Sequence, residues 1–267
     1  MKKILLGTTI LLSLTAFSFF QENNKIVDST SLVKGEHIEY RVHYGFVNAA
    51  EAVVDVDDKL QMANGRPCYK VVVNGRTTGV TDWLTRVRDT WASHIDSEKI
   101  MPHQFYMKKQ EGNYKAEEKV IFDHQQNVAK TFELIDDKEK KTLSIPDGIQ
   151  DVVSSYYYVR AMDFNKTKPG ESYPLSFFFD NKIYNMRLKF KGKETIKTKF
   201  GKIETYKIIP MLPKNNFFVD EESVIIWVSN DANKIPIRVE IGLKIGALAL
   251  DLRSYNGLKQ DLKFDNN

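Results

Sequence analysis

Residues 145–164, Ile-Pro-Asp-Gly-Ile-Gln-Asp-Val-Val-Ser-Ser-Tyr-Tyr-Tyr-Val-Arg-Ala-Met-Asp-Phe, constrain the fold more than any other stretch of the sequence. Asp147 follows a proline and can cap the free amide groups of a first helical turn, and Asp151 suits the positive end of the helix dipole. Pro169 lies beyond the exit, where helices commonly stop. The pattern therefore predicts a helix over about 147–164, the only convincing one after the N-terminal leader.

This helix has one broad apolar side. At about 100° per residue, the following positions fall on that side: Ile149, Val152, Val153, Tyr156, Tyr157, Val159, Arg160 and Phe164. Arg160 lies near the middle of the stripe. Because a guanidinium cannot lose its proton, its burial requires a carboxylate or several carbonyl acceptors. We therefore expect Arg160 to be buried in an ion pair.

The segments on either side of the helix alternate between apolar and polar residues with a period of two, which is typical of strands. The expected strands are 36–44, 50–56, 69–75, 84–94, 104–108, 114–122, 129–134, 173–179, 182–191, 193–199, 202–209, 224–229, 236–241 and 247–255. The glycines of residues 75–79 indicate a bend, and Lys138–Lys141 a lysine-rich turn. Asp89 is the acidic residue most plainly aligned with inward-facing apolar neighbours, Val87 and Trp91, and is the leading candidate to pair with Arg160.

Two strand sets, 36–145 and 172–258, thus flank one helix. They predict a mainly β (α+β) protein, a strongly curved antiparallel sheet or an open barrel or clam wrapped on one central helix (147–164). Residues 34–260 would form a single β-rich domain, followed by a tail at 261–267. Separate domains on either side of the helix are the alternative.

The N-terminus resembles an export signal. Lys2 and Lys3 precede an apolar run, and Ala16 and Ser18 place small residues where a signal peptidase reads. We expect residues 1–18 to be cleaved, leaving a flexible lead-in at 19–33 and no transmembrane span. An uncleaved membrane anchor is the alternative.

Charge and motif searches exclude several classes of function. Removal of Lys2 and Lys3 lowers the formal net charge from +4 to +2, so no electrostatic footprint for nucleic acid remains. Five histidines lack the spacing of a zinc hydrolase, and no nucleophile elbow or phosphate-binding loop occurs. We predict no catalytic residue, metal or cofactor. The single cysteine, Cys68, is expected to be a small apolar strand residue, with a reactive thiol as the alternative.

Four stretches carry a family resemblance: residues 35–45, residues 146–160, Phe200-Gly-Lys with Ile209-Pro210, and residues 226–236 (Ile-Trp-Val-Ser-Asn-Asp-Ala-Asn-Lys-Ile-Pro). In this order they resemble the exported proteins of domain-of-unknown-function family 3108. The resemblance implies a mainly β protein of the Gram-negative periplasm, with no established activity. More distantly, the arrangement is similar to periplasmic lipoprotein carriers, in which a half-barrel wraps on helices. That likeness concerns architecture alone.

Three classes of function remain. The first is binding or carriage of a lipid-like apolar ligand, with Tyr156, Tyr157, Arg160 and Phe164 as the predicted ligand-binding residues. The second is a structural or adaptor role in the cell envelope through protein–protein contacts, and the third is an enzyme of unrecognised type. For any single aromatic cluster, such as Tyr156–Tyr158, packing in the core is the favoured interpretation over lining a cavity.

Overall fold

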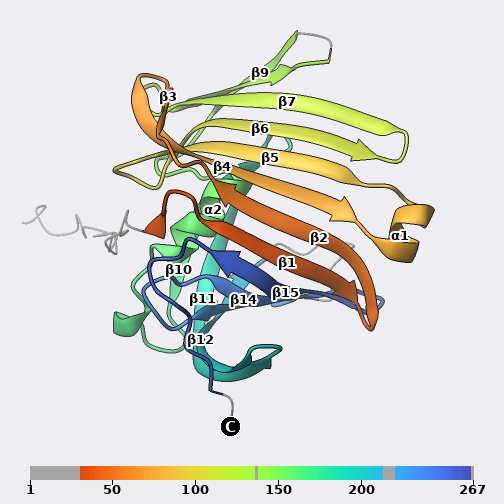
Figure 1. Cartoon of the computed structure of the whole chain (residues 1–267). Coiled ribbons are helices and arrows are strands. Elements are labelled where there is room, and N and C mark those ends of the chain that lie inside the picture. Colours follow the sequence, from red (N-terminus) through yellow and green to blue (C-terminus); the bar gives the residue numbers. More distant parts are fainter. Residues whose placement is uncertain (1–30, 136–137, 213–219, 266–267) are drawn as a thin grey trace, which may run out of the picture.

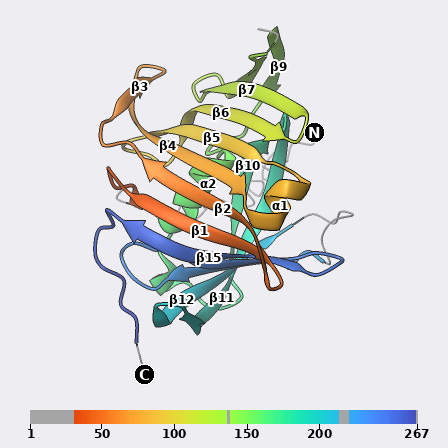
Figure 2. The same cartoon turned by 45° about the vertical axis from the view of Figure 1, so that its right-hand side comes forward.

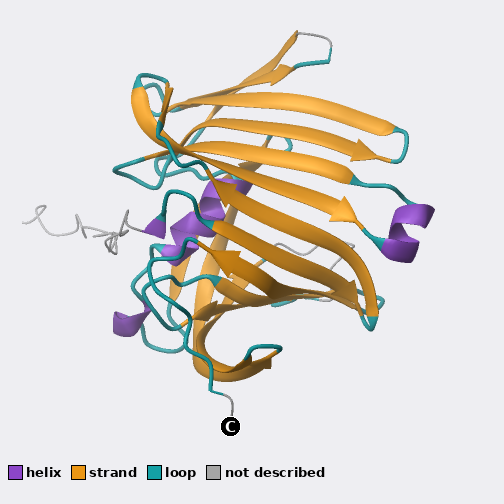
Figure 3. Ribbon diagram, viewed as in Figure 1, coloured by secondary structure: helices purple, strands orange, loops and turns teal. Residues whose placement is uncertain are grey.

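The computed structural model describes residues 31–135, 138–212 and 220–265, and within these residues strands form a single antiparallel sheet (Figures 1 and 3). In chain order the strands are β1 (His37–Tyr44), β2 (Val47–Val56), β3 (Gln61–Ala63), β4 (Arg66–Thr77), β5 (Arg88–Asp96), β6 (Pro102–Glu111), β7 (Tyr114–Asp123), β8 (Val128–Glu133), β9 (Lys138–Ser144), β10 (Ser172–Phe179), β11 (Lys182–Thr198), β12 (Gly201–Met211), β13 (Val224–Ser229), β14 (Pro236–Gly242) and β15 (Ala247–Asn256). The helices are α1 (Gly79–Leu84), α2 (Val152–Arg160) and a short 3-10 turn, η2 (Phe164–Lys166). The predicted leader, residues 1–18, lies outside the described residues.

The two predicted strand sets join in one sheet. Its order is β10-β11-β12-β13-β14-β15-β1-β2-β4-β5-β6-β7-β8-β9, with β3 added to β4. β1 therefore lies in the middle and pairs with both β2 and β15, so that Tyr40 faces Ala52 on one side and Leu252 on the other. The predicted mainly β class, a strongly curved antiparallel sheet with a helix inside it, is confirmed.

The sheet curls without closing. Its ends approach each other through side chains: Asn181 Nδ2, at the turn after β10, donates to Glu118 Oε2 on β7 at 3.1 Å. Phe178 of β10 packs edge-on against Phe122 of β7, with 5.8 Å between ring centroids. α2 lies inside this curve, between the β1–β5 wall and the β10–β11 wall (Figure 1).

The helix is shorter than predicted. It begins after Asp151, whose side chain accepts from the backbone N–H of Ser154 while the Ser154 hydroxyl accepts from the backbone of Asp151, a reciprocal cap. Asp147 does not cap it, because the preceding residues pair with the sheet: the Gln150 N–H donates to Ser176 O, and the Phe178 N–H donates to Gln150 O. Backbone groups used in that pairing cannot also start a helix.

Both sides of α2 are buried. One side packs with β1, β2, β4 and β5 through Val153, Tyr157 and Ala161. The other packs with β10–β13 through Val159 and Met162. The helix therefore joins the two walls of the curved sheet.

Three local predictions were wrong. The bend predicted at 75–79 is the end of β4 followed by a second helix, α1, so that the strand predicted from Leu84 begins only at Arg88. Lys138–Ser144 form the edge strand β9 rather than a turn. Lysines on an exposed edge strand oppose pairing with other chains, so the charge run is compatible with a strand. β11 is one long strand rather than two, because Gly192, with φ of 110°, forms a bulge through which the strand continues.

Candidate functional site

Arg160 is buried in an ion pair at one end of the concave face. Its Nη1 and Nη2 donate to Glu36 Oε1 and Oε2 at 2.6 and 2.7 Å, and its Nε donates to Asn233 O at 3.1 Å. The Tyr157 hydroxyl also donates to Glu36 Oε1, at 2.9 Å. Only 1% of Arg160 and 1% of Glu36 is exposed. Acceptors thus surround the guanidinium, and α2 is locked to the start of β1.

The prediction that Asp89 pairs with Arg160 was wrong. Asp89 does lie on the concave face and is buried, but it accepts from the Gln110 backbone N–H at 3.0 Å. The N-terminus of α2 contacts β5 at Ser93, whose hydroxyl donates to Asp151 Oδ2 at 2.6 Å. Asp89 lies four residues, about 13 Å, before Ser93 along the strand, while the other end of α2 points towards the start of β1. The alternation of side chains placed Asp89 on the correct face of the sheet but did not show how far along that face it lies from Arg160.

Both side chains that donate to Glu36, those of Arg160 and Tyr157, keep their protons. Burial alone would lower the pKa of Arg160, but the charge of Glu36 and its hydrogen bonds raise that pKa above its ordinary value. Burial, then the charge of Glu36, raises the pKa of Tyr157 well above its usual range. Arg160 and Tyr157 therefore have a structural role and neither gains nor loses a proton near neutral pH.

The four predicted ligand-binding residues differ in exposure. Tyr157, Arg160 and Phe164 are closed off from solvent, with 0%, 1% and 2% of their surfaces exposed. Tyr156 remains partly exposed, and its hydroxyl lies 3.0 Å from that of Tyr40. Of the four, only Tyr156 keeps partly exposed surface in this structure.

Beyond α2, the concave face carries apolar side chains that remain partly exposed. Strand register places them on the same face as Tyr40 and Val54, and we call them the apolar concave face: Val42, Ala50, Ala52, Val73, Trp91, Ile226, Val239, Ile241, Leu248 and Leu250. The indole N–H of Trp91 is buried without a hydrogen-bond partner among the described residues. One end of the concave face is thus sealed by α2, whereas the other is lined by apolar groups that are only partly covered.

Exposed apolar residues surround this second end. They lie on the β1–β2 turn, on α1 and on the β14–β15 turn, which Figures 1 and 2 show at the same end of the sheet, and we call them the apolar rim: Tyr44, Phe46, Val47, Val80, Trp83, Leu84 and Ile245. The Tyr44 hydroxyl donates to Ile245 O at 2.9 Å, joining two of these turns. The Thr78 N–H donates to Ala49 O at 3.0 Å, attaching α1 to β2.

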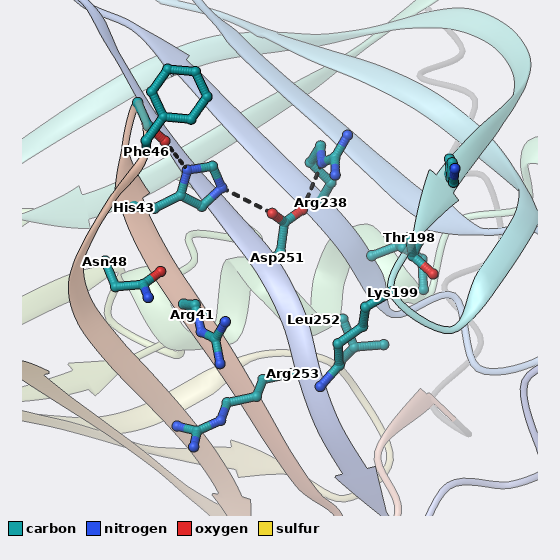
Figure 4. Close-up of a pocket in the computed structure, with 13 residues that line it drawn as sticks. Arg41, His43, Phe46, Asn48, Thr198, Lys199, Arg238, Asp251, Leu252 and Arg253 are labelled. Carbon is teal, nitrogen blue, oxygen red and sulfur yellow. Dashed lines mark hydrogen bonds and ion pairs between the residues drawn. The ribbon is translucent and has the colours of Figure 1, made fainter.

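A pocket of about 440 Å³ lies on the opposite, outer face of the sheet (Figure 4). Its walls come from β1, β14, β15 and the end of the β11–β12 hairpin. We call it the basic pocket for its charged lining residues, Arg41, Lys197, Lys199, Arg238, Asp251 and Arg253, beside which His43 also lines it. Asp251 Oδ2 lies 2.9 Å from His43 Nε2, and Asp251 Oδ1 accepts from Arg238 Nε at 2.6 Å. Sequence reasoning missed this pocket, although the strand alternation that turned Val42 inward also turned Arg41 and His43 outward.

Other chemistry is sparse in the described residues. Burial raises the pKa of the Cys68 thiol to about 11, so the thiol stays protonated at neutral pH. Within residues 31–135, 138–212 and 220–265, no group of three His, Cys, Asp or Glu side chains could hold a metal ion. Over the same residues, no helix has the length and apolar character needed to cross a bilayer.

Solved structures of two other proteins resemble this chain to different degrees. A β-barrel-like protein of domain-of-unknown-function family 1849 from Brucella abortus matches with a TM-score of 0.53 and 10% sequence identity, over 84% of this chain and 99% of that one. At that identity the likeness shows the fold alone. A protein named as a candidate lipoprotein from Parabacteroides distasonis covers 84% of this chain and 95% of its own, with 12% identity. Its TM-score of 0.30 is too low to carry an argument.

The family comparison covers most of the sheet. A comparison with curated proteins finds no match. The model of the family described as "Protein of unknown function (DUF3108)" matches residues 39–253, which run from β1 to β15 and include α2. The chain therefore belongs to the DUF3108 family.

Proposed function

We propose that this protein is an exported envelope protein that binds or carries a lipid-like apolar ligand on the apolar concave face. The observation that carries the proposal is that the two ends of the concave face differ in exposure. α2 covers the side chains at one end and leaves apolar side chains partly exposed at the other. Each Å² of apolar surface removed from water contributes about 25 cal/mol, so a ligand lying there gains free energy without rearranging the core.

The shapes of the side chains support an elongated apolar ligand. Ala50 and Ala52 are small and lie on neighbouring inward positions of β2. They leave room between the larger Leu250 on β15 and Trp91 on β5, each two strands away from β2. Tyr156 lies on α2 and keeps partly exposed surface, so it would border the ligand at the sealed end, while its hydroxyl is bonded to that of Tyr40. Under this proposal Tyr157, Arg160 and Phe164 hold the floor of the site rather than contacting the ligand.

The apolar rim supports entry of the ligand from this end. It also favours a second candidate function, an adaptor that binds another envelope protein, because exposed apolar patches commonly mark protein contacts. The two functions differ in whether the concave face itself is occupied.

Displacement of a fluorescent fatty acid, backed by native mass spectrometry of the purified protein, tests the proposal. Ala50→Phe places a large ring on the apolar concave face and should abolish saturable binding. Val53→Phe adds a ring of the same size on the outer face of the same strand and should leave binding unchanged. Absence of both saturable binding and a co-purifying ligand in the wild-type protein would contradict carriage and favour the adaptor.

Export is a separate part of the proposal and rests on the leader with Lys2, Lys3, Ala16 and Ser18. We expect N-terminal sequencing of protein recovered from the periplasm to begin within a few residues of position 19. Intact Met1 in a membrane fraction would contradict cleavage and favour the anchor.

A further inference from the structure

We propose that the basic pocket binds the phosphate group of a phosphate ester. This site lies on the outer face of the sheet, away from the apolar concave face, so the inference does not depend on the lipid-binding proposal. It rests on the charges that line the pocket and on how few of them are neutralised.

Positive side chains outnumber negative ones in the lining of the basic pocket. Five fixed cations, from Arg41, Lys197, Lys199, Arg238 and Arg253, face a single carboxylate, Asp251. The contacts of Asp251 with Arg238 and His43 already use that carboxylate. Arg253 is shared with Glu51 and Glu39, which lie outside the lining, and Glu51 also pairs with Arg76.

Three cations lack a carboxylate partner among the described residues: Arg41, Lys197 and Lys199. The Lys199 ammonium lies over the Phe200 ring, 4.6 Å from its centroid, which does not cancel its charge. Figure 4 shows Arg41, Arg253 and Lys199 extending into the same space from different elements. The side chains of Arg41, Lys197 and Lys199 are exposed, so solvent screens their mutual repulsion. Together they still raise the local positive potential of the pocket, and that potential attracts an anion.

The donors favour phosphate over a carboxylate. A guanidinium presents a planar fork that matches two phosphate oxygens, and Arg41 brings such a fork from β1, with a lysine approaching from the β11–β12 hairpin. Arg253, on the adjacent strand β15, adds positive charge although its Nη1 already pairs with Glu51. A phosphate monoester carries up to two charges and three free oxygens, so it can accept from several directions at once. The pocket, at about 440 Å³, holds more than the ion alone, so the phosphate would be attached to an organic group such as a sugar or glycerol.

Calorimetric titration of the full protein tests this site with three probes: inorganic phosphate, glucose 6-phosphate with glucose as the uncharged control, and phosphatidic acid in phosphatidylcholine vesicles. We expect saturable binding of at least one phosphate ester, no binding of glucose, and weaker binding as the salt concentration rises. Binding of glucose 6-phosphate would identify a soluble ester as sufficient, whereas binding of the vesicles alone would identify a lipid headgroup. No binding of either ester would overturn the proposal.

Matched variants separate the pocket from general surface charge. Arg41→Ala with Lys199→Ala should lower the affinity about tenfold or more, because each removes a charge-assisted hydrogen bond. Lys115→Ala with Lys130→Ala removes the same charge from exposed positions on β7 and β8 and should change the affinity less than about twofold. Equal losses in the two double variants would overturn the proposal. Asp251→Asn should raise the affinity, and this gain keeps the test informative if an arginine variant folds poorly.

Discussion

The two ends of the concave face follow the same alternation of apolar residues but have different surroundings. At the α2 end, Arg160 and Glu36 are buried together and the guanidinium is bonded at all three of its nitrogens. At the rim end, side chains such as Val42 and Leu250 point the same way yet remain partly exposed. Alternation therefore decides which face is apolar, whereas cover by a helix decides whether that face serves stability or remains available for binding.

The largest expected effect comes from breaking the sealed end. Arg160→Ala should lower the free energy of unfolding by about 3 to 5 kcal/mol, because Glu36 would remain buried without a counter-charge. Denaturant titration measures this loss. A double variant, Glu36→Leu with Arg160→Met, restores apolar packing and should recover much of the stability. An unchanged midpoint in Arg160→Ala would mean that the pair is not buried in solution.

The N-terminus of α2 should make stability depend on pH. Burial raises the pKa of Asp151 to about 6, against an ordinary value of 3.8. Because the folded chain holds this proton more tightly than the unfolded chain, its stabilising contribution is present below about pH 4 and is lost as pH rises to about 6. The loss amounts to about 3 kcal/mol.

Comparison with Asp151→Asn isolates this effect, since asparagine retains an acceptor for the Ser154 N–H. Between pH 4 and pH 7 the wild type should lose stability relative to the variant, while other titrating groups cancel in the difference. Parallel stability curves for the two proteins would show that Asp151 does not titrate in this range.

A smaller effect is expected at Asp89, which tests the identity of the partner of Arg160. Asp89→Asn keeps an acceptor for the Gln110 N–H and leaves no buried cation without a partner, so the cost should be about 1 kcal/mol. Denaturant titration of Asp89→Asn and Arg160→Ala side by side compares their losses in the free energy of unfolding. Similar losses in the two variants would indicate that Asp89, and not Glu36, carries the pairing.

The smallest effect is expected at the rim. Phe46 is fully exposed on the β1–β2 turn, so Phe46→Ser should change the free energy of unfolding by less than about 0.5 kcal/mol. If the rim admits the ligand, the same variant should slow uptake of a fluorescent fatty acid in a stopped-flow assay. A stability loss as large as that of Asp89→Asn would show that the rim packs against the protein and is not free.

Local sequence patterns predicted most of the strands but often misplaced the points at which strands and helices begin and end. Period-two alternation located β1, where buried Ile38 and Tyr40 alternate with less buried residues. It began the strand of β5 four residues early, at Leu84, and in β5 adjacent residues such as Ala92 and Ser93 are both buried. It missed β9, where most side chains are exposed and no alternation is visible. The start of α2 was misplaced because Gln150 pairs with β10, a contact between segments that the helix pattern does not describe.

The sequence by itself determined that Arg160 needs a buried acceptor, since its charge cannot be removed and its position lies within the apolar stripe. It also determined the faces on which Asp89, Arg41 and Tyr40 lie, because side-chain direction follows from strand periodicity. Only the tertiary structure decided that Glu36 would meet Arg160, and that Arg41 would meet a hairpin end far away in the chain to form a pocket. The reason is physical: the order and stagger of strands in a curved sheet depend on the packing of the whole core, and no local pattern specifies them.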